Sequence, residues 1–324
     1  MRLRMIKGRT QGILAALSSA AFLGITPVFG KLAINYGFSP LAVAGLRTSL
    51  AAALIFVVML LFYRPYLYIY PVGLIGCLLA GAINGFGSIL YYMALQRLDA
   101  SIGQTLYLIY PFFVAIWLIL DHQPPSRLTM LRMGLAGLSI LLLTTLPAHP
   151  ADPIGVAMML GAAALYALHL PINQRVLYEV PAPTVTLYTL LAMTLVVLPA
   201  YLLFDRQWIA PSGLWWPVIG LTIATLISRL TLFFGVKHIG GMQTALLGLG
   251  ELLVTIIFSY IFLQENLAWT QWLGAAGLGL SLVLVRLEKP HPIQYHGQGG
   301  WLSWIRPPDI SRNAPADIPW GQDQ

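Results

Sequence analysis

The chain has 324 residues, of which 58% are hydrophobic and only 9% are charged, and its mean hydropathy is +0.78. Soluble domains carry about 25% Asp, Glu, Lys and Arg, so this chain has too few charges to solvate a globular surface. The composition therefore excludes a soluble enzyme and a soluble nucleic-acid-binding protein, and it predicts an integral membrane protein.

Stretches of about 20 apolar residues, bounded by charges, prolines or turn residues, predict ten membrane-spanning helices. In chain order the predicted spans are 11–33, 40–62, 71–95, 100–120, 128–146, 153–174, 183–204, 214–236, 241–263 and 267–285. Short loops make successive helices antiparallel neighbours. The predicted fold class is thus an all-α integral membrane protein with ten transmembrane helices.

The two ends of the chain are predicted to lie outside the spans. Residues 1–10 form a basic N-terminus, and residues 287–324 form a polar tail with Pro and Gly, which we expect to be disordered. The first apolar stretch contains Pro27 and ends at Lys31 without a cleavage pattern, so it is interpreted as a retained span rather than a signal peptide.

The basic residues fix the predicted orientation. Of the 18 Lys and Arg residues, thirteen fall on the side of the N-terminus, three fall on the other side, and two lie inside spans. Because cytoplasmic loops carry the excess of Lys and Arg, both termini are predicted to be cytoplasmic, in a multi-pass protein of the cell inner membrane. The same rule explains the net charge of +7 without a nucleic-acid partner.

The two halves of the chain show an internal repeat. Gln104 and Gln243, each followed by Thr, occupy corresponding places in the fourth and ninth spans, and Gly134 and Gly274 lie near the start of the next span in each half. The halves are residues 11–147 and 152–286, with five spans each. Because five is odd, the second half enters the membrane in the opposite sense, an arrangement typical of secondary transporters.

Three segments carry a resemblance to a known family. They are AAFLGITPVFGK in the first span, SPLAVAGLR at the start of the second, and ELLVTIIFSYIFLQENLAWTQWLGAAG across the ninth and tenth. With them the chain resembles the EamA-domain family of the drug/metabolite transporter superfamily. The resemblance implies two EamA-type repeats that transport small organic metabolites or drugs, such as amino acids or related compounds, outward by alternating access.

No motif for catalysis or metal binding occurs in the sequence. There is no HExxH, no paired-Cys ligand set, no GxSxG elbow and no phosphate loop. We therefore expect no enzymatic activity, no metal and no cofactor. The partners expected are a small-molecule substrate and the lipid bilayer, and no oligomeric state follows from the sequence.

Glu251 and Arg229 are the most informative polar residues inside the spans. They lie roughly 15 and 12 Å deep, at about 1.5 Å per residue in an apolar layer about 30 Å thick. A charge at that depth costs about 2.5–3.5 kcal/mol, so both should face the bundle interior. Either they form a structural ion pair, or they line a central cavity where Arg229 binds a carboxylate or phosphate and Glu251 binds an amine or a proton.

Three further polar residues each have a structural and a functional interpretation. Arg47, about 10 Å from the outer face, either caps carbonyl groups or binds substrate. His169, just before Pro171, is either a satisfied core histidine or a proton relay. Asn84 lies between two glycines and indicates either close helix packing or an amide in the cavity.

Aromatic residues of the fourth span are candidates for a substrate lining. Tyr107, Tyr110 and Trp117 share approximately one helical face, and Pro111 predicts a kink of the kind that opens transporter cavities. Packing or lipid contact is the alternative interpretation. Gln104 and Gln243 are weaker candidates for the same site.

Three other functions compete with a proton-coupled transporter. A facilitator or exchanger would move a metabolite without a proton. A membrane-embedded enzyme would need a catalytic cluster at one membrane face, and the loops contain none. A sensor would depend on the tail rather than on the spans.

Overall fold

The computed structural model describes residues 2–98, 100–143, 152–205, 214–254, 269–288 and 300–305. Within these ranges the regular secondary structure is helical, without a strand. The elements are α1 (Arg2–Asn35), α2 (Pro40–Phe62), η1 (Arg64–Leu67), α3 (Pro71–Arg97), α4 (Ala100–Tyr107), α5 (Tyr110–Leu120), α6 (Arg127–Leu143), α7 (Pro153–Leu177), α8 (Ala182–Phe204), α9 (Trp216–Ile239), α10 (Gly241–Gly248), α12 (Trp269–Val283) and η2 (Leu284–Leu287).

These elements confirm an all-helical protein built to lie in a membrane. Eight helical stretches in the described ranges are long and apolar enough to cross a bilayer, and a shorter apolar helix covers Gly241–Val254. The second half of the predicted ninth span lies outside the described residues. The total of ten transmembrane helices therefore stays a prediction.

Prolines and capping side chains explain where several helices begin. Pro40 and Pro153 occupy the first turns of α2 and α7, where the missing N–H costs nothing. Ser39 caps α2 by accepting a hydrogen bond from the Ala42 N–H at 3.0 Å. Asp152 caps α7 in the same way, and the Arg97 guanidinium, 3.0 Å away, holds the pKa of that carboxyl below its usual range.

The predicted fourth span is broken into two helices. Helix α4 ends at Tyr107 and α5 begins at Tyr110, with a turn at Leu108 and Ile109 between them. Pro111 causes the break, because its ring clashes with the preceding turn and it has no N–H to donate. The predicted kink at Pro111 is confirmed.

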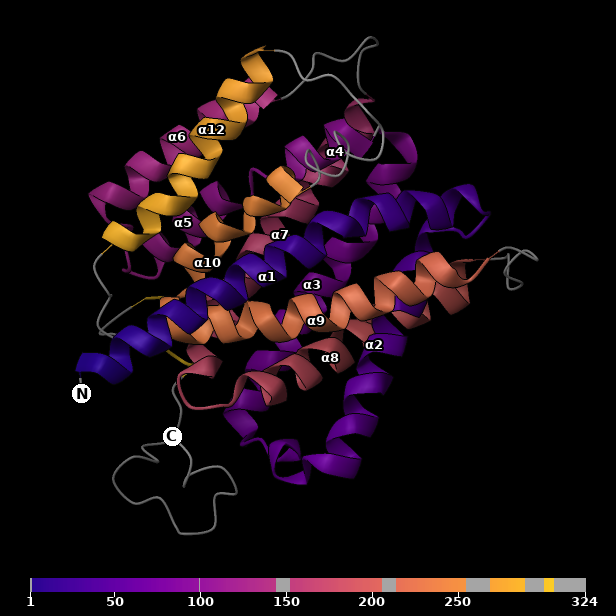
Figure 1. Ribbon diagram of the computed structural model, residues 1–324. Helices are drawn as coiled ribbons and strands as arrows, with labels where there is room; N and C mark the ends of the chain where they lie inside the picture. Colours follow the sequence, from indigo (N-terminus) through magenta and orange to yellow (C-terminus); the bar gives the residue numbers. More distant parts are fainter. Residues whose placement is uncertain are drawn as a thin grey trace.

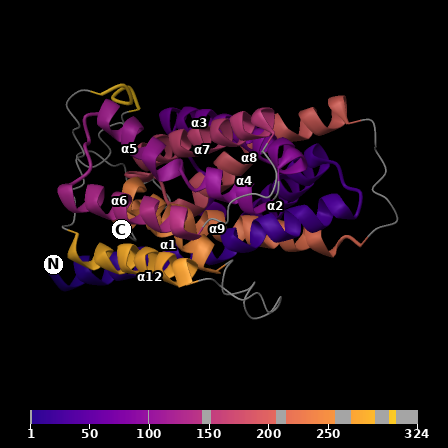
Figure 2. The same cartoon turned by 90° about the horizontal axis from the view of Figure 1, so that it is seen from above.

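The helices form one bundle whose contacts repeat between the two halves (Figures 1 and 2). The first helix of each half packs against the third of the other, α1 with α9 and α7 with α3. The second helices pack together, α2 with α8, and so do the last ones, α6 with α12. This exchange of equivalent contacts fits two repeats related by a pseudo-two-fold axis.

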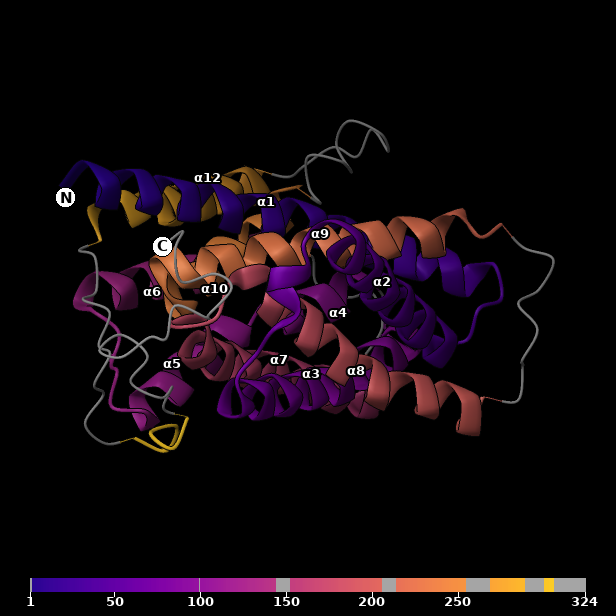
Figure 3. The same cartoon turned by 90° about the horizontal axis from the view of Figure 1, so that it is seen from below.

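Arg9 ties the beginning of the bundle to its last described helix. Its guanidinium donates to the Val285 carbonyl at 2.7 Å and to the Glu288 carbonyl at 2.5 Å, and Figures 2 and 3 show the start of α1 on the same side of the bundle as α12. Helix α1 begins at Arg2, so the basic N-terminus predicted as a separate segment continues directly into the first helix. The side of the bundle that holds Arg9 and Glu288 is called the Arg9 end below.

Part of the predicted disordered tail is packed against the bundle, which differs from the sequence expectation. Leu302 and Ile305 are buried, and the Leu302 N–H donates to Asp121 at 3.1 Å. The Asp121 carboxylate also pairs with Arg175 at 2.6 Å. A low average hydropathy hides this short apolar segment, Gly300–Ile305, because the surrounding tail is polar.

Helix packing between α3 and α8 depends on Gly81. A Cβ at this position would lie 2.5 Å from both the Ala192 Cβ and the Thr189 carbonyl oxygen. We expect Gly81→Val to lower the free energy of unfolding by about 1–3 kcal/mol, or to prevent folding, because the added side chain overpacks the contact between the helices. Thermal unfolding of the purified protein measures this. Gly134→Val is the matched control, since nothing lies within 4 Å of a Cβ there, and equal effects of both variants would contradict the prediction.

Candidate functional site

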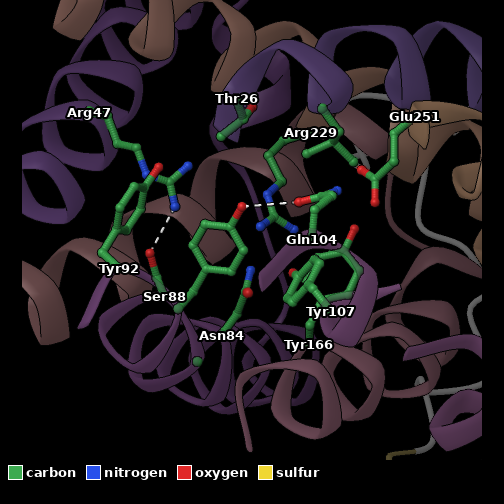
Figure 4. Close-up of a pocket in the computed structure, with 13 residues that line it drawn as sticks. Thr26, Arg47, Asn84, Ser88, Tyr92, Gln104, Tyr107, Tyr166, Arg229 and Glu251 are labelled. Carbon is green, nitrogen blue, oxygen red and sulfur yellow. Dashed lines mark hydrogen bonds between the residues drawn. The ribbon is translucent and has the colours of Figure 1, made fainter. Parts of the chain in front are cut away.

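Residues from both halves of the chain line a cavity within the bundle (Figure 4). Its volume is about 50 Å³, smaller than the roughly 300–1,000 Å³ typical of sites that enclose a drug-sized ligand. The lining residues are Leu23, Thr26, Arg47, Asn84, Gly87, Ser88, Tyr91, Tyr92, Gln104, Tyr107, Tyr166, Arg229 and Glu251. Six of the ten predicted site residues therefore meet here: Glu251, Arg229, Arg47, Asn84, Gln104 and Tyr107.

Arg229 projects from α9 into the cavity and is only 5% exposed. With the Asn84 amide oriented so that its oxygen faces the guanidinium, that oxygen accepts hydrogen bonds from NH1 at 3.1 Å and from NH2 at 2.8 Å. The guanidinium also lies 5.4 Å from the centre of the Tyr166 ring. These neutral groups orient the charge without neutralising it.

His169 lies behind the cavity and supports Arg229. Its Nε2 is 3.2 Å from the Arg229 guanidinium, and its Nδ1 contacts the Tyr166 carbonyl. A neutral imidazole that carries its proton on Nδ1 satisfies both contacts, since Nδ1 then donates and Nε2 accepts. This geometry favours a positioning role for His169.

Arg47 reaches the cavity from α2. Its guanidinium donates to the Thr225 hydroxyl at 3.1 Å and to the Ser88 hydroxyl at 2.8 Å, and it lies 5.0 Å from the centre of the Tyr92 ring. The side chain is 8% exposed, and its Nε has no hydrogen-bond partner among the residues described. One donor of this buried cation therefore stays unsatisfied among the described residues.

Glu251 follows the short helix α10 and is 3% exposed. Gly24 lets α1 approach it closely, because a Cβ there would lie 2.7 Å from the Glu251 carbonyl oxygen. Glu251 is the one acidic residue among the lining residues. It places a proton-binding group in a cavity that otherwise contains cations, amides, hydroxyls and aromatic rings.

Of the two interpretations of Arg229 and Glu251, the structural ion pair is not found among the described residues. In the described part of the chain, the ion pairs join Arg97 to Asp152, Arg132 to Glu288, and Arg175 to Asp121. Arg229 and Glu251 instead share the lining of one cavity. Depth along a helix could not distinguish the two interpretations, because it does not specify which side chains lie within ion-pair distance.

Tyrosine rings form the aromatic part of the lining. The Tyr91 hydroxyl donates to the Gln104 amide oxygen at 3.2 Å, and the Tyr107 ring lies 4.9 Å from Tyr91 and 5.4 Å from Tyr166. Tyr110 packs behind them, 4.9 Å from the Tyr166 ring, and its hydroxyl donates to the Ala245 carbonyl at 2.9 Å. Tyr107 thus lines the cavity, whereas Tyr110 supports it.

Two of the predicted site residues lie elsewhere. Trp117 packs against Trp301, with ring centres 6.0 Å apart, because the break before α5 turns its face away from that of Tyr107. Gln243 bonds to Thr129 at 3.0 Å and to Arg132, at the Arg9 end. The opposite entry of the repeats places Gln243 and Gln104 at opposite ends of the bundle.

Several lining residues were not predicted. They are Leu23, Thr26, Gly87, Ser88, Tyr91, Tyr92 and Tyr166. Helical spacing could have found two of them, because Tyr91 lies seven residues after Asn84 and Tyr166 lies three before His169. Ser88 and Thr26 carry no comparable signal, since isolated hydroxyls are common in membrane helices.

Comparison with known proteins gives a consistent result. The model of the EamA-like transporter family matches residues 10–145 and 153–287. An uncharacterized transporter of Synechocystis is 24% identical over 221 residues, 63% of this chain and 64% of that protein. Protein PecM of Dickeya dadantii is 25% identical over 214 residues, 64% of this chain and 71% of PecM. A solved structure titled only as a crystal structure of a protein shares the fold, with a TM-score of 0.67 and 16% identity over 87% of this chain and all of that one.

Proposed function

Because this chain belongs to the EamA-like transporter family, we propose that it exports small organic metabolites or drugs, amino acids among them, across the cell inner membrane. Family membership makes it a membrane transporter of the drug/metabolite type, with a small-molecule substrate and a lipid bilayer as partners. The observation that carries the proposal is the polar cavity, to which both repeats contribute charged side chains. Transporter sites lie at such repeat interfaces.

The repeat contacts support alternating access as the mechanism. The pairs α1–α9 and α3–α7 are equivalent under exchange of the halves. If each pair adopts the arrangement of the other, the cavity opens to the opposite side without a change of fold. Arg229, Arg47, Asn84, Gln104 and Tyr107 bind the substrate during this exchange, while His169 and Tyr110 position them.

Glu251 is proposed to couple transport to a proton. It is buried, and its carboxylate shares the cavity with two guanidinium groups. Protonation would change the charge of the cavity by one unit in each transport cycle. A facilitator or exchanger remains the second candidate function, and it needs no titration of Glu251.

A comparison of metabolites tests the proposed function. The small molecules in cells and in medium are measured with the gene present and deleted, and compounds retained by the deletion strain are assayed with the full chain in lipid vesicles. We expect gene-dependent release and stimulation by a pH gradient. Counterflow at a rate independent of the pH gradient would indicate a facilitator or exchanger. An unchanged metabolite profile together with no transport in vesicles would contradict the proposal.

A further inference from the structure

The cavity contains more positive than negative charge. Arg47 and Arg229 both line it, and in the described residues neither guanidinium has a carboxylate within ion-pair distance. Their hydrogen-bond partners are the neutral side chains of Thr225, Ser88, His169 and, in the orientation given above, Asn84. Buried charges are normally paired, so two guanidinium groups that lack an ion-pair partner in one cavity require an explanation.

The two guanidinium groups adjoin the same stretch of α9. Arg47 donates to Thr225, which lies four residues, or about one helical turn, before Arg229. In Figure 4 the side chain of Arg229 lies between those of Arg47 and Glu251. Like charges held close together in a medium of low dielectric repel each other, and an anion placed between them removes that repulsion.

We propose that the substrate carries a monovalent carboxylate, which Arg47 and Arg229 bind together. The proposal rests on the function proposed above and specifies its substrate class. A guanidinium presents a planar set of donors that matches the two oxygens of a carboxylate, and the Nε of Arg47 is a buried donor without a described partner.

Charge balance favours a monoanion over a phosphate dianion and over a cation. In the state in which Glu251 is ionised, its carboxylate and the two guanidinium groups leave one positive charge in the lining, which one carboxylate neutralises. A dianion would leave an excess negative charge unless Glu251 were protonated. An amine without a carboxylate would be repelled by the two guanidinium groups. A basic group on the substrate would therefore bind only next to Glu251.

Binding by matched compounds tests this proposal independently of transport. Thermal unfolding of the purified full chain is measured at fixed ionic strength with 3-phenylpropionate, its amide and 3-phenylpropylamine, and with butyrate, butyramide and butylamine. Phenyl phosphate and inorganic phosphate complete the set. We expect a saturable rise of the unfolding temperature with at least one carboxylate, because a ligand of the native state stabilises it, and none with its amide or amine.

Variants locate the binding groups. Arg229→Gln and Arg47→Gln are each expected to weaken carboxylate binding at least tenfold, whereas Arg229→Lys retains part of it. Arg97→Gln, which removes a guanidinium outside the cavity, should bind as the wild type does. Should a glutamine variant fail to fold, the comparison of carboxylate, amide and amine on the wild type still decides the substrate class.

Several results would overturn the carboxylate assignment. They are an equal or larger shift with an amide or amine, a preference for phosphate, and the absence of a shift with every carboxylate. Gene-dependent transport of compounds that lack a carboxylate would also overturn it, while leaving the transporter function intact. Carboxylate binding without any transport would support the carboxylate site, but it would contradict the proposed transporter function.

Discussion

Replacement of Glu251 by Gln is expected to abolish the response of transport to a pH gradient and to lower gradient-driven flux at least tenfold. Glutamine has nearly the same shape, but it binds no proton in the physiological range. Glu251 is the one acid among the residues that line the cavity, so no neighbouring lining group replaces it. Flux in vesicles with and without an imposed gradient measures the effect.

Two comparisons make this result specific. Glu179→Gln changes an acid just after α7, outside the cavity, and should leave the gradient response intact. Thermal unfolding of Glu251→Gln separates a loss of coupling from a loss of folded protein. If the variant keeps normal gradient-driven flux, proton coupling through Glu251 is wrong and the facilitator is favoured.

Arg175→Gln is expected to give a large loss of stability, about 3–5 kcal/mol, because it leaves the Asp121 carboxylate buried without its cation. The pair is short, 2.6 Å, and its side chains are 7% and 1% exposed. Thermal unfolding of the purified protein should show a marked decrease in the midpoint. The exposed pair of Arg97 and Asp152, with side chains 46% and 32% exposed, provides the matched control, and Arg97→Gln should change the midpoint little.

A double variant identifies the cause of the destabilisation. In Arg175→Met combined with Asp121→Asn, both charges are absent, and the asparagine oxygen can still accept from the Leu302 N–H. The double variant should be more stable than Arg175→Met alone, because the single variant leaves the Asp121 charge unpaired. The explanation fails if the double variant is less stable, or if Arg175→Gln and Arg97→Gln have equal midpoints.

The sequence predicts the helices better than it predicts their contacts. Pro40, Pro71 and Pro153 mark helix starts because proline fits the first turn of a helix without the loss of a hydrogen bond, and this effect is local. The burial of Arg229 and Glu251 is also predictable, because the bilayer penalises a charge that faces lipid. Their relative position depends on helix rotation and on the short helix α10, which the apolar pattern does not specify.

The residues that were misplaced show what local patterns miss. Trp117 has the spacing of a shared face with Tyr107, but the break at Leu108 and Ile109 changes the direction of the chain between them. The repeat pairs Gln104 with Gln243, yet inversion sends one into the cavity and the other to Arg132. Both outcomes follow from the three-dimensional arrangement of distant segments.

The burial of Gly300–Ile305 changes where the independently stable unit of this protein ends. The family match stops at residue 287, but Leu302 and Ile305 complete the apolar packing, and Gly300, with φ +116°, fits against Asp121 where a Cβ would lie 2.5 Å from the carboxylate oxygen. A chain shortened to the two repeats would expose that apolar surface and remove one donor from Asp121. The smallest chain that retains this packing therefore extends to residue 305.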